Sequence, residues 1–153
     1  MNFNLSSNRP RKQLRVVSLK LLMGAALIAA ASPSPLALAS CVNPGGTAGC
    51  YSTISAAVSA AVPGTTIWVA SGTYKEDVVI GKTLFLIGAD SSNTIIDATG
   101  LPNGVYIDGL DNAGLSSVLV SGFTIENANY EGLLITNASS VTIRSNGTNI
   151  FQM

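Results

Sequence analysis

The chain has 153 residues, of which 47% are hydrophobic, 10% charged and 6% aromatic, and it contains two cysteines and no histidine. This length allows one modest domain. Without histidine the chain cannot build a Ser-His-Asp or Cys-His nucleophile arrangement or a His-ligated metal site, and two cysteines cannot supply a four-thiolate zinc or iron–sulfur site.

The charges are distributed unevenly along the chain. Five of the eight basic residues lie in the first twenty positions, whereas the eight acidic residues begin only at Glu76. The part after residue 39 therefore carries a net charge of −5 and has no basic patch. We expect no nucleic-acid partner, because nucleic-acid binding needs clustered Lys and Arg.

The first 39 residues have the composition of an export signal. Basic residues between 9 and 20 precede an apolar run at 21–31, and a tail of small residues ends in Ala37-Leu38-Ala39. The apolar run is too short for a transmembrane helix, which needs roughly 20 residues. We expect residues 1–39 to be a cleaved signal peptide of bacterial type, the protein to be secreted or in the cell envelope, and the mature chain to lack a transmembrane segment.

Two uses are open for the cysteines, Cys41 and Cys50. A disulfide between them would close the Gly- and Pro-containing loop 42–49, as suits a small exported domain. The string Leu38-Ala39-Ser40-Cys41 is also similar to a bacterial lipoprotein box, in which Cys41 would be acylated. The disulfide is favoured because lipidation would leave Cys50 unpaired, and it makes 40–50 a tethered N-terminal segment.

Residues 52–62 predict one short amphipathic helix. Ser52 is available as an N-cap, and Pro63-Gly64 would stop the helix. The apolar residues recur at helical spacing and form one stripe of mostly small side chains, at Ile54, Ala57, Val58 and Ala61.

Short β-rich triplets make up the rest of the chain, separated by Gly, Asn, Asp and Ser. They begin at residues 67, 78, 84, 94, 105, 118, 123, 133 and 141. No Asn-Gly or Asp-Gly pair joins two triplets at hairpin spacing. An antiparallel sandwich is therefore disfavoured.

The triplets recur in groups of three. The segment that begins Ser116-Ser117-Val118 returns as Ser139-Ser140-Val141, a shift of 23 residues. Such a period is typical of a solenoid whose coils stack in parallel at roughly 4.8 Å, with the outer residues of each triplet pointing inward. We expect an all-β solenoid of about three coils, with the helix at 52–62 as a lid on its first coil.

Several segments resemble known proteins. Ile67-Trp-Val-Ala-Ser-Gly-Thr-Tyr, Leu84-Phe-Leu-Ile-Gly and Thr94-Ile-Ile-Asp look like the opening of right-handed parallel β-helix proteins of the pectin-lyase-like superfamily, and of pectin methylesterases in particular. The later Ser121-Gly-Phe-Thr-Ile-Glu-Asn-Ala resembles generic bacterial right-handed β-helix repeats. The resemblance implies a right-handed parallel β-helix over residues 51–153, with a short N-terminal capping α-helix.

The residues that catalyse reactions in this superfamily have no counterparts here. The chain lacks the Gln-Ala-Val-Ala-Leu and Gln-Asp-Thr-Leu-Tyr segments of pectin methylesterases, and beyond residue 39 its basic residues are Lys75, Lys82 and Arg144, interpreted as surface charges. We assign no catalytic residue. We expect an exported non-catalytic β-helix module, a scaffold or surface module associated with extracellular or cell-wall carbohydrate. The alternative is the N-terminal part of a pectinesterase or polysaccharide lyase whose catalytic residues lie further along.

One pair of carboxylates indicates a possible calcium site. Aligning the triplets at 94 and 123 places Asp97 and Glu126 at equivalent positions on successive coils, some 5 Å apart. A bound calcium would offset their repulsion, and a nearby loop with Asp108, Asp111 and Asn112 could act likewise. The competing interpretation is that these are turn residues that bond to nearby backbone.

After Asn146 the repeat pattern ends without a polar capping element. We therefore expect a β-helix domain truncated at its C-terminal end, whose open end meets further β-helix coils or associates with itself.

Overall fold

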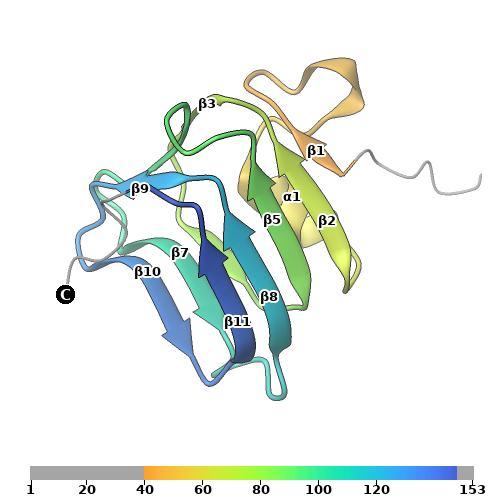
Figure 1. The fold of residues 1–153 in the computed structure, drawn as a ribbon, viewed down its shortest axis with the longest axis vertical. Helices are drawn as coiled ribbons and strands as arrows, with labels where there is room; N and C mark the ends of the chain where they lie inside the picture. Colours follow the sequence, from red (N-terminus) through yellow and green to blue (C-terminus); the bar gives the residue numbers. More distant parts are fainter. Residues whose placement is uncertain (1–39, 148–153) are drawn as a thin grey trace, which may run out of the picture. The chain divides into compact units, whose positions relative to one another are not determined.

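The structure is a computed structural model that describes residues 40–147 (Figure 1). The expected signal peptide lies outside the described residues. Among residues 40–147 the helical segments are the 3₁₀ turn Thr47–Gly49 and α1 at Ile54–Ala60. The strands are β1 Cys41–Val42, β2 Thr65–Val69, β3 Gly72–Tyr74, β4 Val78–Ile80, β5 Leu84–Gly88, β6 Thr94–Asp97, β7 Asn103–Asp108, β8 Ser116–Ser121, β9 Thr124–Glu126, β10 Glu131–Thr136 and β11 Ser139–Arg144.

The described residues are mostly in strands, which confirms the all-β class, and every strand pair among residues 40–147 is parallel. The strands form three sheets, ordered β1-β2-β5-β8-β11, β4-β7-β10 and β3-β6-β9. From β2 onward the chain visits the three sheets in turn, and from β5 onward each strand pairs with the strand three places earlier. Ser139 pairs with Ser116 and Ile143 with Val120, so the 23-residue shift expected from the sequence is the register of β11 on β8.

Alternating side chains build one core between the sheets. In β8, Val118 and Val120 are buried whereas Leu119 is only half-buried, as the triplet pattern predicts. The column formed by Ile80, Ile107 and Ile135 shows how the core ends. The first two are 0% exposed and Ile135, on the last strand of its sheet, is 41% exposed.

Helix α1 is shorter than the sequence indicated. It runs over Ile54–Ala60 instead of 52–62, and the expected N-cap Ser52 is wrong, because the side chain of Thr53 accepts the bond from the Ala56 N–H at 3.2 Å. Thr53 has the extended backbone that an N-cap requires. The expected stripe is confirmed for Ile54, Ala57 and Val58, which are buried in the core, whereas its fourth member Ala61 lies beyond the helix with an extended backbone and is half-buried.

Two charged side chains hold the ends of α1. Glu76 accepts hydrogen bonds from the N–H groups of Ile54 and Ser55, both at 2.8 Å. Lys82 donates to the carbonyl oxygens of Ser59 at 3.1 Å and Ala61 at 3.0 Å. The carboxylate thus meets the positive end of the helix dipole and the ammonium meets the negative end. The interpretation of Lys82 as a solvated charge was therefore wrong.

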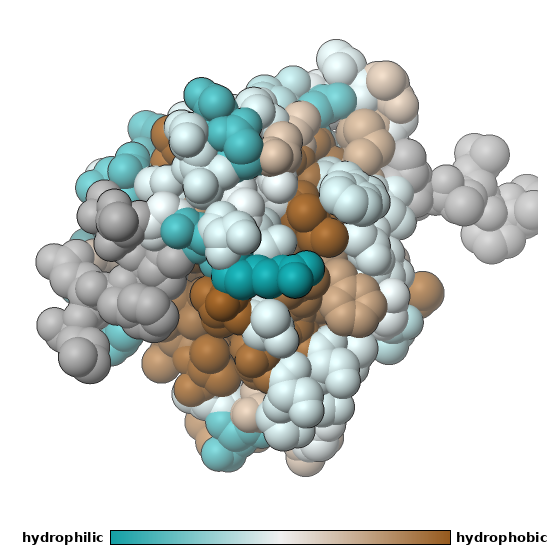
Figure 2. Space-filling view, in the orientation of Figure 1, coloured by the Kyte–Doolittle hydropathy of each residue, from teal (hydrophilic) through white to brown (hydrophobic). Residues whose placement is uncertain are grey.

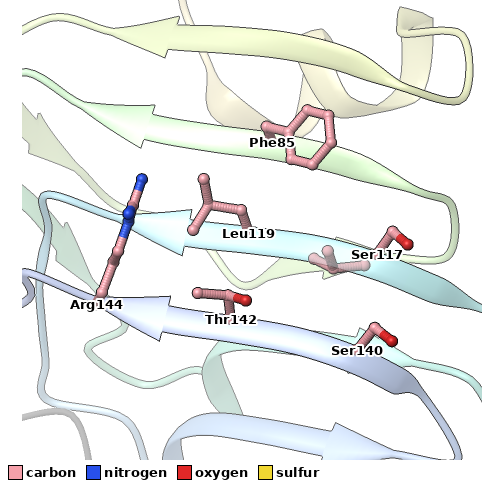
Figure 3. Close-up of a pocket in the computed structure, with 7 residues that line it drawn as sticks. Phe85, Ser117, Leu119, Ser140, Thr142 and Arg144 are labelled. Atoms are coloured by element: carbon pink, nitrogen blue, oxygen red, sulfur yellow. The ribbon is translucent and has the colours of Figure 1, made fainter.

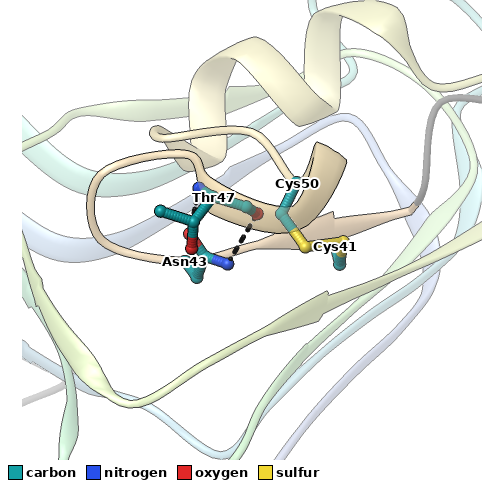
Figure 4. The surroundings of a disulfide bond; sticks show 4 residues. All are labelled: Cys41, Asn43, Thr47 and Cys50. Atoms are coloured by element: carbon teal, nitrogen blue, oxygen red, sulfur yellow. Dashed lines mark hydrogen bonds between the residues drawn. A yellow bond between two sulfur atoms is a disulfide. The ribbon is translucent and has the colours of Figure 1, made fainter.

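A disulfide joins Cys41 and Cys50, with their Cα atoms 4.9 Å apart (Figure 4). Inside the loop that it closes, the Asn43 side chain accepts from the Thr47 N–H at 2.9 Å and donates to the Thr47 carbonyl at 3.0 Å. The bond uses the Cys41 sulfur that acylation of a lipoprotein would need. It fixes the segment between β1 and α1.

Candidate functional site

The outer face of the sheet β2-β5-β8-β11 carries the residues that the core does not use. The strand register stacks them in two rows, which we call the ladder face. One row is Thr66, Phe85, Leu119 and Thr142, and the other is Trp68, Ile87, Ser121 and Arg144. Each row therefore places one residue on each strand, about 4.8 Å apart, although Ser121 is buried and is not presented to solvent.

A hollow of about 440 Å³ lies on the ladder face, over β5, β8 and β11 (Figure 3). Phe85, Leu119 and Thr142 line it along one row, and Arg144 lines it at the end of β11. The hydroxyl-bearing residues Ser117 and Ser140 complete one side. Both serines have left-handed backbones, with φ of 58° and 52°, so successive strands repeat the same local shape.

Part of the exposed apolar surface lies on this face, although other large apolar side chains, such as Leu110 and Tyr130, are exposed elsewhere. Trp68 is 58% exposed, and Phe85, Ile87 and Leu119 are half-buried. In the space-filling view, hydrophobic side chains are visible over the central strands of the sheet, with hydrophilic and paler ones between and beside them (Figure 2). Contiguous exposed apolar surface rimmed by polar groups marks a binding surface.

The chemistry of the hollow suits binding of a polar ligand with apolar faces. Arg144 is the one titratable residue among its lining residues. Its planar guanidinium can donate paired hydrogen bonds to a carboxylate, and the hydroxyls of Ser117, Ser140 and Thr142 can donate or accept. Phe85 and Leu119 offer flat apolar contact between these polar groups.

Sequence reasoning did not find the hollow, although a signal for it was present. The alternation rule places residues 68, 85 and 119 on the outer face, where polar side chains are ordinarily expected. Instead the sequence has Trp68, Phe85 and Leu119. Apolar residues at the outward position of successive strands are the feature that indicates the ladder face.

The predicted carboxylate pair is brought together as expected. Asp97 pairs in register with Glu126, on β6 and β9. However, one oxygen of Asp97 already accepts from the Thr99 hydroxyl at 2.6 Å and the Asn127 side chain at 3.0 Å. These bonds, the one from Thr99 first, hold the pKa of Asp97 below its usual value. They are turn interactions, and calcium binding at this pair stays a prediction.

The second acidic loop is organised by its own backbone. Asp108 accepts from the N–H groups of Leu110 at 3.0 Å and Asp111 at 3.1 Å, and from the Tyr106 hydroxyl at 2.9 Å. Asn112 donates to the Asp108 carbonyl at 2.9 Å. Within residues 40–147, no group of three or more acidic or cysteine side chains is arranged to hold a metal ion.

Comparison with known proteins identified no relative of this chain. No protein-family model matches the chain, and no curated protein matches it. In the described part of the chain, no helix is both long enough and apolar enough to span a membrane.

Proposed function

We propose that the chain is an exported right-handed parallel β-helix module that binds extracellular or cell-wall polysaccharide on its ladder face without catalysing a reaction. The β2–β4, β5–β7 and β8–β10 groups would be its three coils, and α1 the cap on the first. The cyclic visit to three parallel sheets supports the solenoid. Parallel crossover connections are overwhelmingly right-handed, which supports the handedness.

The observation that carries the binding proposal is the ladder face itself. A polysaccharide chain laid across the strands would meet one outward side chain per strand, at a regular spacing. Trp68 and Phe85 would contact the apolar faces of sugar rings, and the hydroxyls beside them would bond to sugar hydroxyls. Arg144 would contact a carboxylate of an acidic polymer.

Binding is proposed in preference to catalysis because the charged residue that lines the hollow is an arginine, not a pair of carboxylates. General acid–base catalysis of glycoside cleavage uses a pair of positioned carboxyl groups, whereas Arg144 is the titratable residue that lines this hollow. Export is supported by the leader-like composition of residues 1–39. The disulfide supports an oxidising compartment.

Trp68 provides the direct test, because it is the single tryptophan of the chain and is 58% exposed. We expect its emission to shift to shorter wavelength when neutral and acidic cell-wall polysaccharides are titrated. Phe85→Ala should weaken binding about tenfold, the effect of losing one aromatic contact. Affinity gel electrophoresis measures the same loss independently of fluorescence.

Matched controls keep the test specific. Tyr130→Ala removes an aromatic residue that is 68% exposed and lies outside the ladder face, and should leave binding unchanged. Arg144→Ala should weaken acidic polymers and spare neutral ones, whereas Lys75→Ala should affect neither. Equal losses in Phe85→Ala and Tyr130→Ala, or no emission change with any polymer, would contradict the proposal.

A further inference from the structure

The outer edge of β11 is the free edge of the five-stranded sheet. Within residues 40–147, β11 pairs only with β8, and no described strand lies on its other side. Figure 1 shows β11 at the border of the sheet opposite β1. An unpaired parallel strand presents N–H and C=O groups that bind another strand.

Core-facing side chains next to this edge are incompletely covered. Val141 and Ile143 of β11 are half-buried, whereas their register partners Val118 and Val120 are 1% and 0% exposed. Ile135 on β10 is 41% exposed although it belongs to a core column. The edge is therefore apolar on its inner side, and covering it would remove apolar surface from water.

The other end of the same sheet cannot accept β11. The outer edge of β1 is already used, because Val42 bridges to Tyr51, the Tyr51 N–H donates to the Cys41 carbonyl at 2.9 Å and the Asn43 N–H donates to the Tyr51 carbonyl at 3.0 Å. A head-to-tail contact between copies would have to break these bonds. An assembly through this sheet must instead use β11 in both copies. Because such a contact uses the same strand of each copy, it forms a closed dimer and cannot add a third copy.

We propose that β11 pairs antiparallel with β11 of a second copy, about a two-fold axis that passes through Thr142. Directly opposed residues of an antiparallel pair point to the same face. This register sets outward Thr142 opposite itself, and inward Val141 opposite Ile143 of the second copy. It sets Arg144 opposite Ser140, so no like charges meet. The two ladder faces would then be continuous across the axis.

The test measures the mass of the full chain by light scattering and sedimentation over a range of concentrations. The expected result is a dimer without larger species. Thr142→Lys places two ammonium groups opposite each other and should weaken the dimer about tenfold or more. Thr66→Lys is the matched control, because Thr66 occupies the same row on β2, on the opposite side of the sheet from β11. Circular dichroism checks that both variants fold.

A cross-link tests the register independently of affinity. Opposed residues in an antiparallel pair have Cα separations that a disulfide can span. Oxidised Thr142→Cys should therefore run as a covalent dimer, and Thr66→Cys should not. A monomer at every concentration, with Thr142→Cys left uncross-linked, would overturn the proposal and leave the chain's own residues 148–153 as the cover. A series of larger oligomers would overturn it in favour of head-to-tail contact. Neither outcome alters the polysaccharide test, which reads Trp68.

Discussion

At the scale of single residues, two aspartates show opposite effects of environment. Asp108 accepts two backbone N–H bonds and a tyrosine hydroxyl, and these bonds, the one from Asp111 first, lower its pKa. Asp77 has a buried carboxylate oxygen without a hydrogen-bond partner. Burial raises the pKa of Asp77, and the bond from the Asn103 backbone opposes the rise only in part. One carboxylate therefore stabilises the fold when ionised, and the other destabilises it.

The two shifts predict opposite dependences of stability on pH. The contribution of Asp108 is present above the ordinary aspartate pKa of about 3.9, and it is lost as the pH falls through the lower folded value. Asp108→Asn should therefore lower the melting temperature at pH 7, and its deficit should vanish in strong acid. Asp77→Asn should raise the melting temperature at pH 7 by about 2 °C, because it removes a charge that burial disfavours. That gain should disappear below the ordinary pKa.

Thermal melts between pH 2 and 7 measure both variants beside the parent chain. Two substitutions that shift the melting temperature in the same direction at pH 7 would contradict the assignment. So would a difference that stays constant across the whole range, since neither carboxylate would then be the titrating group.

At the scale of elements, α1 is held by side chains from the strands and loops that follow it. Its seven residues would be too few for a stable isolated helix. Burial of Ile54, Ala57 and Val58 supplies packing, and Glu76 and Lys82 satisfy backbone groups at its two ends. Both charged residues come from the segment between β3 and β5, so α1 can form only when that segment is in place.

We call Glu76 and Lys82 the α1 clamp, because they bond to the two ends of the helix. Replacing Glu76 should destabilise the fold more than replacing Lys82. Glu76→Gln loses two charge-assisted bonds at a 9% exposed site and should lower the free energy of unfolding by about 2–3 kcal/mol. Lys82→Met should cost about 0.5–1 kcal/mol, because its ammonium is more exposed. Lys75→Met, at an exposed position without such contacts, is the control. Urea unfolding measures all three, and a Glu76→Gln loss no larger than that of Lys75→Met would contradict the clamp.

Strands with strong alternation of inward apolar and outward residues could be predicted from the sequence, and strands without it could not. All nine triplets lie in or beside strands, because β-branched and aliphatic residues alternate there with outward ones. Strands β1 and β3 were missed, since Cys41–Val42 is two residues long and Gly72–Tyr74 has no apolar alternation. The roles of Glu76 and Lys82 were also missed, because they depend on contacts made across more than twenty residues of chain.

At the scale of the whole molecule, the fold is held by contacts between distant segments. From β5 onward, each described strand pairs with the strand three places earlier, and only β1 and β2 pair as neighbours in sequence. Pairing of this kind is slow to form because loops must close first. It also makes the ladder face, since outward side chains form rows only when the register is constant from strand to strand.

The register itself is the claim on which the ladder face, the proposed cap and the edge of β11 all depend. Nuclear Overhauser contacts between backbone protons of neighbouring strands measure it most directly. We expect contacts that link Val118 with Val141, Leu119 with Thr142 and Val120 with Ile143, so that the difference between residue numbers stays at 23. Contacts in which the sum of the residue numbers is constant instead would show antiparallel strands and would contradict the account.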